Sequence, residues 1–437
     1  MPGSIDQMTT YILLEQDDWF EAEIRFVRRL LRPGMRTIDV GANHGVYTLA
    51  MARTVGPQGQ VWAFEPTPAT ADFLQQSLEL GGFRQVRLLR SAVSDRSGTA
   101  RFNAGAHSEL NAIAAGDGAP GGIEVDVATL DGLAAELGWR DIDFIKIDAE
   151  GHERSVFLGG KSFFARQSPL VMFEIATGDA KDLSVARQFE ELGYRIYYLV
   201  PGLLLLAPAD LSAPLDAYQI NLFACKDDRA GQLALAGLLA TDATPPADAS
   251  GDPATRALES FAGAQDAALP SEQRLGLLTL AMHSASHALS DSGCLPHVIT
   301  YARIAGDYGQ RASAAQAFKL AQAMTPDHWS ETLERPFLAP SPRFEAIPMA
   351  DAARPWLECS VVEERLRLVN YSSYFTGTLT LPLIDALGGN PFKAPEMERR
   401  RQLIRMRQGA QSGPEAHPLL AKASEQNLNP AFWRGLS

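Results

Sequence analysis

Residues 37–50, TIDVGANHGVYTLA, lead from a short apolar run through two glycines into a segment with helical periodicity. Glycine lets the backbone approach a neighbouring group closely and tolerates dihedral angles that other residues avoid. In an open parallel sheet, ligands bind beyond the carboxyl ends of the strands, and Gly41 and Gly45 fall at such an end. The stretch therefore predicts a strand, a turn and a helix that border a ligand site. A tight turn without a ligand is the alternative interpretation, because glycine occurs in many turns.

Short apolar runs alternate with helical patterns up to about residue 228. The runs QVWAFE, QVRLLRSAV, DIDFIKID and PLVMFEI are predicted strands, and the first helix is predicted over about residues 17–31. Strands that alternate with helices are typical of βαβ units, which build a mostly parallel sheet covered on both faces. Residues 1–228 are therefore predicted to form one α/β domain.

The composition changes after residue 228. Residues 229–256 include the stretch ATDATPPADASGDPAT, whose content of Ala, Pro, Asp and Thr is typical of an interdomain linker. Residues 257–437 are predicted to be mainly helical, and YARIAGDYGQRASAAQAFKLAQAMTP resembles one tetratricopeptide helix pair. No fold is predicted beyond about residue 325.

The charge and the cysteine content narrow the range of partners. The chain has 437 residues, with 39 Lys or Arg against 52 Asp or Glu, and a formal net charge of −13 at pH 7. This acidic balance argues against nucleic acid as a partner, because phosphate binding favours excess positive charge. The apolar runs are too short to span a membrane. Three widely spaced cysteines suit a reducing compartment, so a cytoplasmic location is expected.

The glycine turn does not match the common nucleotide-binding motifs. A P-loop needs a Lys directly after its last glycine, and none follows Gly45; a nicotinamide fingerprint needs G-x-G-x-x-G, whereas the spacing here is G-x-x-x-G. Glu65 ends the second strand, where a carboxylate can accept hydrogen bonds from both hydroxyls of a ribose. Its alternative role is a solvated charge or a cap for the next helix. Together with Asp39 before the glycines, Glu65 favours S-adenosylmethionine, which has no pyrophosphate to bind.

Five stretches carry a resemblance to a known family: IDVGANHGVYT, AFEPTP, IDFIKIDAEGHE, VMFEI and NLFAC. Through them the first 228 or so residues resemble the FkbM family of S-adenosylmethionine-dependent methyltransferases. The resemblance implies a Rossmann-like, seven-stranded methyltransferase sheet with an antiparallel last strand. It also implies O-methylation of a hydroxyl on a sugar, glycan or natural product. The C-terminal half, expected to be a mainly helical domain, lies outside the resemblance.

The resemblance further implies the roles of residues around the cofactor. The glycine turn is expected to surround the methionine portion, Glu65 to hold the ribose, and residues 91–93 to lie near the adenine. Asn43 has the alternative role of stabilising the turn itself, because Asn tolerates left-handed geometry. The cofactor-binding residues predicted in this way are Asp39, Gly41, Ala42, Asn43, Gly45, Glu65, Pro66, Ala92, Val93 and Asp148.

Acidic residues gather where the fourth and fifth strands end. Asp148 and Glu150 are two positions apart, so an extended backbone would place them on one face, and Glu174 ends the next strand. An O-methyltransferase must accept the proton of the acceptor hydroxyl. The predicted catalytic residues are therefore Asp148 first, Glu150 next, and then His152 and Glu174. The alternative roles are a surface position for His152 and helix capping for the neighbouring Glu153.

Other interpretations of the acidic edge and of the whole chain stay open. A divalent cation held by the carboxylates is not favoured, so no residue is predicted as a metal ligand. One alternative function is a non-catalytic, cofactor-binding scaffold whose helical half binds a protein partner, but the acidic and cofactor positions are intact. The other is an NAD-dependent oxidoreductase, against which the glycine spacing argues.

Overall fold

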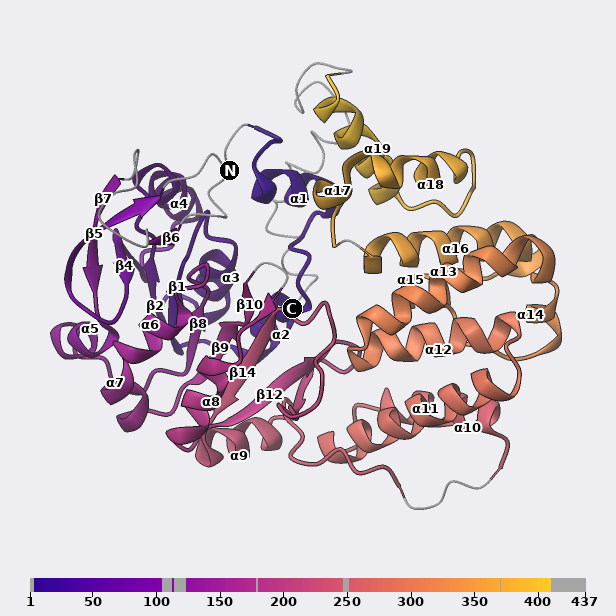
Figure 1. Ribbon diagram of the computed structural model, residues 1–437, viewed down its shortest axis with the longest axis horizontal. Coiled ribbons are helices and arrows are strands. Elements are labelled where there is room, and N and C mark those ends of the chain that lie inside the picture. The colour runs from indigo at the N-terminus through magenta and orange to yellow at the C-terminus, as the bar shows by residue number, and fades with distance from the viewer. Residues whose placement is uncertain are drawn as a thin grey trace.

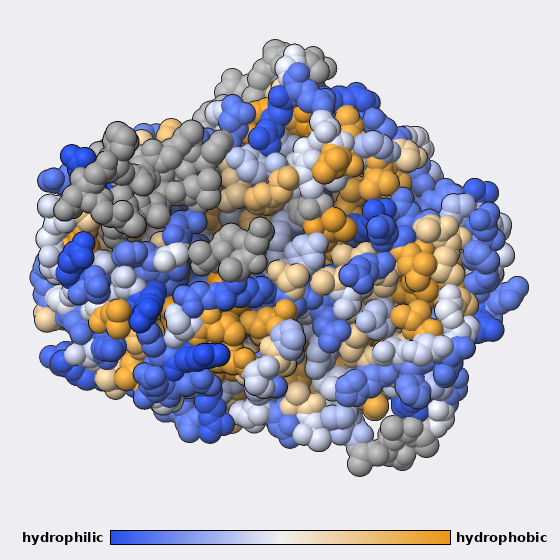
Figure 2. All heavy atoms as spheres, viewed as in Figure 1, coloured by the Kyte–Doolittle hydropathy of each residue, from blue (hydrophilic) through white to orange (hydrophobic). Residues whose placement is uncertain are grey.

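The computed structural model places an α/β part and a helical part side by side (Figure 1). The residues that it describes are 4–103, 112–113, 123–177, 180–246, 251–369 and 371–409. On the face drawn in Figure 2, hydrophilic residues are spread over both parts, and hydrophobic residues form patches among these hydrophilic residues. None of the helices in the described part of the chain has the length and hydropathy of a membrane span.

An eight-stranded sheet forms the centre of the α/β part, in the order β13-β12-β14-β9-β8-β1-β2-β3. The five strands from β9 to β3 run parallel, whereas β14 is antiparallel to both β9 and β12. The predicted methyltransferase sheet with its antiparallel last strand is confirmed, and β13 adds an eighth strand because it folds back on β12 as a hairpin. The bounds are β1 Arg36–Val40, β2 Gln60–Phe64, β3 Val86–Leu89, β8 Phe144–Ile147, β9 Leu170–Glu174, β12 Arg195–Val200, β13 Leu205–Pro208 and β14 Asn221–Cys225.

Helices cover both faces of this sheet, so its strands are apolar on both sides. Strand β8 shows the pattern: Ile145 and Ile147 pack into one core, Phe144 packs into the other, and Lys146 takes the next position on the face of Phe144. Lys146 is thus a buried cation at the end of a strand whose other side chains are apolar. The helices of this part are α1 Met8–Gln16, α2 Ala22–Leu30, α3 Val46–Val55, α4 Pro68–Gly81, α5 Leu130–Glu136, α6 Glu153–Leu158, α7 Lys161–Arg166, α8 Ser184–Glu191 and α9 Asp227–Leu235.

The predicted strand at residues 85–93 is divided between two sheets. Its first part is β3, and its second part, β4 Ser91–Val93, belongs to a four-stranded sheet in the order β4-β7-β5-β6. The two sheets meet next to the end of β2. The remaining short strands are β5 Gly98–Asn103, β6 Ala112–Ile113, β7 Ile123–Ala128, β10 Ala176–Thr177 and β11 Ala180–Lys181.

The chain before β1 forms two helices, α1 and α2, rather than the single helix predicted over about residues 17–31. Asp17 ends α1 with a φ of 62°, in the left-handed region that a helix cannot continue through. Asp18 then accepts hydrogen bonds from the backbone of Trp19 at 2.8 Å and from Arg28 at 2.7 Å. The segment between the helices is therefore an ordered loop, and it carries Trp19 and Phe20.

The chain after β14 is mainly helical, as predicted. The first residues of the predicted linker belong to helix α9. Asp227 and Asp228 lie in the first turn of this helix, where negative charge is favourable. Leu233 of the same helix packs into a core of the sheet. Residues 247–250 of that linker, and residues 410–437, lie outside the described residues. The further helices are α10 Pro253–Ala264, α11 Ser271–Asp291, α12 Leu295–Tyr308, α13 Arg311–His328, α14 Glu331–Glu334, α15 Pro342–Glu345, α16 Ala353–Val369, α17 Ser373–Thr376, α18 Leu381–Ala386 and α19 Pro395–Arg407. The resemblance of α12 and α13 to a tetratricopeptide pair stays a prediction.

The helical part shares a hydrophobic core with the sheet. Val200 of β12 and Leu205 of β13 pack in the same cluster as Phe261 of α10 and Leu278 of α11, and all four side chains are buried. Such a core favours cooperative unfolding of the two parts. The domain boundaries near residues 228 and 256 stay predictions that unfolding experiments can test.

The substitution Leu278→Ala tests whether the two parts unfold together. Because this side chain is fully buried in the shared core, we expect a loss of about 2–5 kcal/mol in the free energy of unfolding. Calorimetry should show one transition, moved to lower temperature. The control Leu320→Ala, at a side chain that is 49% exposed on α13, should change the transition little. Two transitions, of which Leu278→Ala moves only one, would instead support independent domains.

Candidate functional site

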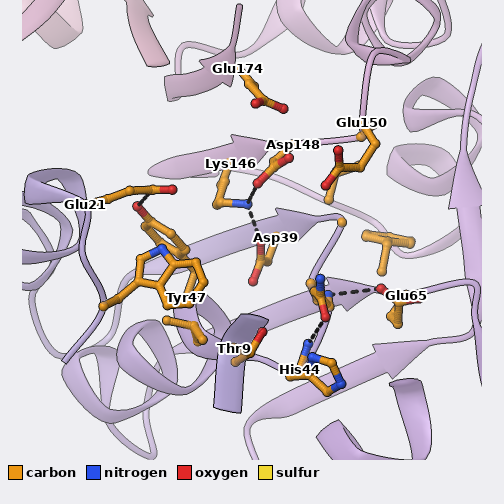
Figure 3. Close-up of a pocket in the computed structure, with 18 of the residues that line it drawn as sticks. Thr9, Glu21, Asp39, His44, Tyr47, Glu65, Lys146, Asp148, Glu150 and Glu174 are labelled. Carbon is orange, nitrogen blue, oxygen red and sulfur yellow. Dashed lines mark hydrogen bonds and ion pairs between the residues drawn. The ribbon is translucent and has the colours of Figure 1, made fainter. Parts of the chain in front are cut away.

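A cavity of about 680 Å³ opens at the carboxyl ends of β1, β2, β8 and β9 (Figure 3). Every residue predicted for cofactor binding or catalysis lines it except Gly45, which lies in the adjoining turn. Residues of α1, of the loop before α2, and the side chains Tyr371 and Phe375 complete the wall. The structure thus brings the predicted residues together, and their individual roles stay predictions.

Packing requires glycine at Gly41, and both glycines of the first turn have a positive φ, which favours glycine. Gly41 has a φ of 77°, and a Cβ atom there would lie 1.7 Å from the carbonyl oxygen of Asp148. Gly45 has a φ of 89°, and a Cβ atom there would lie 2.3 Å from Cδ1 of Leu74. These glycines therefore let the turn approach other parts of the protein closely: Gly41 approaches the end of β8, and Gly45 approaches α4. The predicted strand, turn and helix are confirmed, and the turn lines the cavity with the residues between its glycines.

Glu65, at the end of β2, holds the glycine turn with its carboxylate. Oε2 accepts a hydrogen bond from the backbone N–H of Asn43 at 3.0 Å, and Oε1 accepts one from Thr67 at 2.8 Å. Burial raises the pKa of Glu65, and these backbone N–H groups oppose the rise. Asn43 has a φ of 48° and its side chain accepts a hydrogen bond from the backbone of His44, so it stabilises the turn.

Lys146 is a buried cation between two aspartates. Its Nζ atom lies 2.8 Å from Oδ2 of Asp148 and 4.0 Å from Oδ1 of Asp39 (Figure 3). Burial alone disfavours the charged form, but Asp148 and Asp39 outweigh it and raise the pKa of Lys146 above its usual range. Oδ2 of Asp39 also accepts a hydrogen bond of 2.6 Å from Thr48 of α3. The cavity therefore has a fixed ammonium beside the glycine turn.

Glu21 and Tyr47 extend this network on the side away from Glu65 (Figure 3). The hydroxyl of Tyr47 donates to Glu21, and Nζ of Lys146 lies 4.9 Å from the centroid of the Tyr47 ring. Burial raises the pKa of the Glu21 carboxyl, although Tyr47 and Lys146 oppose the rise. Sequence reasoning missed Glu21 because it assigned residues 17–31 to one continuous helix. The run of acidic and aromatic residues DDWFE is the signal that was available.

Asp148 and Glu150 were predicted to share one face of an extended strand, and this prediction is wrong, because both residues follow the end of β8. Strand β8 ends at Ile147, and Glu150 has a φ of 51°, in a turn that Gly151 continues with a φ of 85°. The chain turns here because α6 begins at Glu153 and must pack back on the sheet. Asp148 and Glu150 both line the cavity all the same.

Glu153 and His152 follow this turn and have identified partners. One carboxylate oxygen of Glu153 accepts the backbone N–H groups of Ala149 at 2.7 Å and Gly151 at 3.2 Å, which is the capping type of role. Nε2 of His152 lies 3.1 Å from the hydroxyl of Ser94. Burial lowers the pKa of His152, so its ring is neutral at neutral pH.

Glu174 faces the other carboxylates from the end of β9. Burial and the charges of Asp148, Glu150 and Glu153 raise the pKa of Glu174 to about 10. Oxygens of Asp148, Glu153 and Glu174 lie within 4.8 Å of one another. A proton on Glu174 relieves this repulsion, and a divalent cation would do the same. The expectation that the site has no metal ligand therefore stays a prediction.

The pKa of Glu174 provides a test by pH. The folded protein holds this proton up to about pH 10, whereas an unfolded Glu releases it near pH 4.5. Stability should therefore fall as pH rises between these values, by at most about 1.4 kcal/mol per pH unit. Glu174→Gln removes this titration, so the melting temperature of the variant minus that of the wild type should increase between about pH 6 and pH 9.

The control for this experiment is Glu79→Gln, at an exposed position on α4. Its melting temperature should follow that of the wild type at every pH. Calorimetry in EDTA measures the effect of the proton alone, and a repeat with Mg²⁺ shows whether a cation replaces it. A difference between Glu174→Gln and the wild type that does not change with pH would contradict the raised pKa.

A family of known proteins matches the part of the chain that carries most of the residues predicted for this site. Residues 39–196 match the Methyltransferase FkbM domain. The 2-O-methyltransferase NoeI of Sinorhizobium fredii is 28% identical over 153 residues, which cover 31% of this chain and 62% of that protein. A protein-L-isoaspartate O-methyltransferase of Methanothrix thermoacetophila is 34% identical over 59 residues, 14% of this chain and 28% of the other. The chain thus spans less than two thirds of the length of these curated relatives.

Two solved structures each match less than half of the chain. A methyltransferase FkbM of Methylobacillus flagellatus is 16% identical, with a TM-score of 0.32, and the match covers 44% of this chain and 43% of that one. An S-adenosylmethionine-dependent O-methyltransferase of Thermotoga maritima is 17% identical, with a TM-score of 0.28, and the match covers 47% and 64%. Residues 39–196, which carry the glycine turn, Glu65 and the acidic edge, are thus an FkbM methyltransferase domain.

Proposed function

We propose that the protein transfers a methyl group from S-adenosylmethionine to a hydroxyl of a sugar, glycan or natural product. The observation that carries this proposal is a single cavity that joins Glu65, at the end of β2, to Asp148, at the end of β8. The FkbM domain supports methyl transfer. The partial similarity to the 2-O-methyltransferase NoeI supports a hydroxyl as the acceptor.

The residues around the cavity fit S-adenosylmethionine. Oδ1 of Asp39 is buried and has no hydrogen-bond partner among the described residues, so it can accept a bond from the ammonium of the methionine portion. The oxygens of Glu65 each accept one backbone N–H, and the side chain of Thr67 is a third donor to this carboxylate. A carboxylate has about four acceptor positions, so one is left for a ribose hydroxyl. Pro66, Ala92 and Val93 line the same end, where the adenine would lie. When bound, the cofactor supplies the methyl group on its sulfonium.

Asp148 is the proposed proton acceptor. Its Oδ2 atom accepts a hydrogen bond from Lys146, which holds the carboxylate in place, and 33% of its side chain is exposed. An acceptor hydroxyl in the cavity can therefore donate to Asp148 and transfer its proton there as the new bond forms. A carboxylate is a weak base. A weak base is sufficient, because the hydroxyl becomes acidic while its oxygen bonds to the methyl group.

The other acidic side chains are proposed to orient the acceptor. Glu174 holds its own proton at neutral pH, so it donates a hydrogen bond rather than accepting a proton. Glu150, in the turn after β8, can accept a hydrogen bond from a second hydroxyl. His152 is the alternative base, since its ring is neutral and lines the cavity. Such contacts align the hydroxyl with the methyl group, which is the main requirement of this transfer.

The proposal includes a cytoplasmic location and excludes nucleic acid as a partner. Cys225, Cys294 and Cys359 are free thiols, which suits a reducing compartment. The net charge of −13 opposes binding to a phosphate backbone. Binding of a protein partner by the helical part remains a separate alternative for that region.

Glu65→Gln tests the cofactor end of the cavity. Both oxygens of Glu65 accept a backbone N–H. In the Gln variant an NH₂ group replaces one of these oxygens, and because it is a donor it cannot accept that hydrogen bond. We expect the variant to bind S-adenosylmethionine about 1–3 kcal/mol more weakly. Titration calorimetry measures this, with Glu79→Gln as the surface control. Unchanged affinity in a folded Glu65→Gln protein would remove Glu65 from the cofactor site.

Asp148→Asn tests the chemical step. The substitution keeps the shape of the side chain and removes the base, so turnover should fall about 10²–10⁴-fold while affinity for S-adenosylmethionine stays nearly the same. The assay is methyl transfer to a sugar or glycan acceptor, measured by mass. Adding EDTA to the wild type separates a base from a metal ligand, because only a metal site responds. Near-normal turnover in Asp148→Asn would transfer the proposed role to His152.

A further inference from the structure

Four aromatic residues line the cavity next to Glu21, and we call Trp19, Phe20, Tyr371 and Phe375 the aromatic wall. The ring centroid of Phe20 lies 4.8 Å from those of Trp19 and Tyr371 and 6.2 Å from that of Phe375. The side chain of Phe375 is 50% exposed. Glu21 lies on the opposite side of the cavity from Glu65 (Figure 3), so the aromatic wall lies at the end away from the proposed ribose position.

The aromatic wall comes from outside the FkbM domain. Trp19 and Phe20 precede residue 39, where the domain match begins, and Tyr371 and Phe375 follow residue 196, where it ends. The domain therefore contributes most of the proposed cofactor end and the acidic edge, whereas the flanking segments contribute the aromatic wall and, through Thr9 of α1, a contact beside the glycine turn (Figure 3).

Glu15 of α1 holds the two segments of the aromatic wall together. Its side chain is fully buried, and it accepts hydrogen bonds from the backbone N–H of Ser373 at 2.9 Å and from the hydroxyls of Ser372 and Ser373. Arg400 of α19 lies 3.5 Å from the same carboxylate. Charge-assisted bonds to a buried carboxylate are strong, so α1 and residues 371–375 keep a fixed relation.

Tyr371 is fixed from a second side. The guanidinium of Arg311 lies 3.6 Å from the centroid of its ring, and its hydroxyl donates to the backbone carbonyl of Tyr218. Its own carbonyl oxygen accepts a hydrogen bond of 2.6 Å from Gln16. The face that the aromatic wall presents to the cavity is thus rigid, as a binding surface for a specific acceptor must be.

The charges around this end restrict the acceptor. Glu21, Asp148, Glu150 and Glu174 all line the cavity, and Lys146 is the one Lys or Arg of its described lining. Lys146 is already paired with Asp148. The carboxyl groups of the described lining outnumber its cation, because Asp39 and Glu65 belong to it as well. An anionic acceptor would therefore meet an excess of negative charge, whereas a neutral acceptor with several hydroxyls would find several carboxyl groups to bond.

We propose that the aromatic wall and these carboxyl groups form a subsite for a neutral pyranose ring. This inference rests on the proposed function and names its acceptor class. A pyranose has one face of C–H groups, which stacks on aromatic rings, and a rim of hydroxyls, which donate to carboxylates. A phenolic acceptor could use the rings but has few hydroxyls for the acidic groups. The acceptor specificity of the enzyme is thus set by residues on both sides of the FkbM domain.

Ligand-observed NMR on the full chain tests this directly, with and without S-adenosylhomocysteine. The probes are methyl α-D-mannopyranoside, methyl α-D-glucopyranoside and methyl α-L-fucopyranoside, compared with the anionic methyl α-D-glucuronoside and with catechol. We expect at least one neutral pyranoside to bind more tightly than both comparison ligands. Phe375→Ala should weaken that binding about 3–10-fold, and Phe375→Tyr should restore it.

The matched control is Leu379→Ala, which removes another exposed apolar side chain, 80% exposed and outside the cavity lining, and should leave sugar binding unchanged. The proposal is overturned if no neutral pyranoside binds, if the glucuronoside or catechol binds equally well, or if Phe375→Ala has no effect. If pyranosides bind as expected and S-adenosylhomocysteine does not bind, the sugar subsite stands and the proposed methyl transfer fails.

Discussion

The ion pair between Lys146 and Asp148 is the interaction on which the site depends. A buried ammonium costs several kcal/mol of desolvation unless carboxylates compensate for it, and here Asp148 and Asp39 do so. Asp39 is the direct partner of Lys146 in the register of β1 and β8, which brings the second carboxylate to the same ammonium. Gly41 then lets the first turn rest on the carbonyl of Asp148. An apolar residue in place of Asp39 or Asp148 would remove an acceptor from the buried ammonium, and a larger residue in place of Gly41 would clash with the end of β8.

From Lys146 the same network leads to the rest of the cavity. Tyr47 packs its ring against the ammonium and donates to Glu21, and Glu21 follows directly on Trp19 and Phe20. The cation that orders the acidic edge therefore also orders the loop that carries half of the aromatic wall. A buried network of this kind becomes more rigid as its members find partners, and the hydrogen bonds from Lys146 to Asp148 and from Tyr47 to Glu21 supply such partners.

Much of the fold and part of the site follow from local patterns. The alternation of strands and helices, the glycine turn and Glu65 at a strand end are all visible in short windows of sequence, so they were predictable. The positive φ of Glu150 was not predictable, because an alternation of strands and helices does not indicate a left-handed turn at a residue other than glycine. Contacts such as that between Glu15 and Ser373, 358 positions apart, leave no periodic signal at all. Sequence reasoning therefore found the residues of the proposed cofactor end and missed the aromatic wall.

A wall supplied from both ends of the chain can position an acceptor only if the helical part is held firmly against the sheet. Misplacement of a substrate by about 1 Å can cost about 10²-fold in rate, so a single flexible attachment would not suffice. Two of the attachments of the helical part lie far apart in the sequence: the core that Leu205 of β13 shares with α10 and α11, and the buried bonds of Glu15 to residues 372 and 373. Two attachments far apart in the sequence oppose rotation as well as separation. The helices thus hold the proposed acceptor end of the cavity opposite Asp148, while most of the proposed cofactor end comes from the FkbM domain.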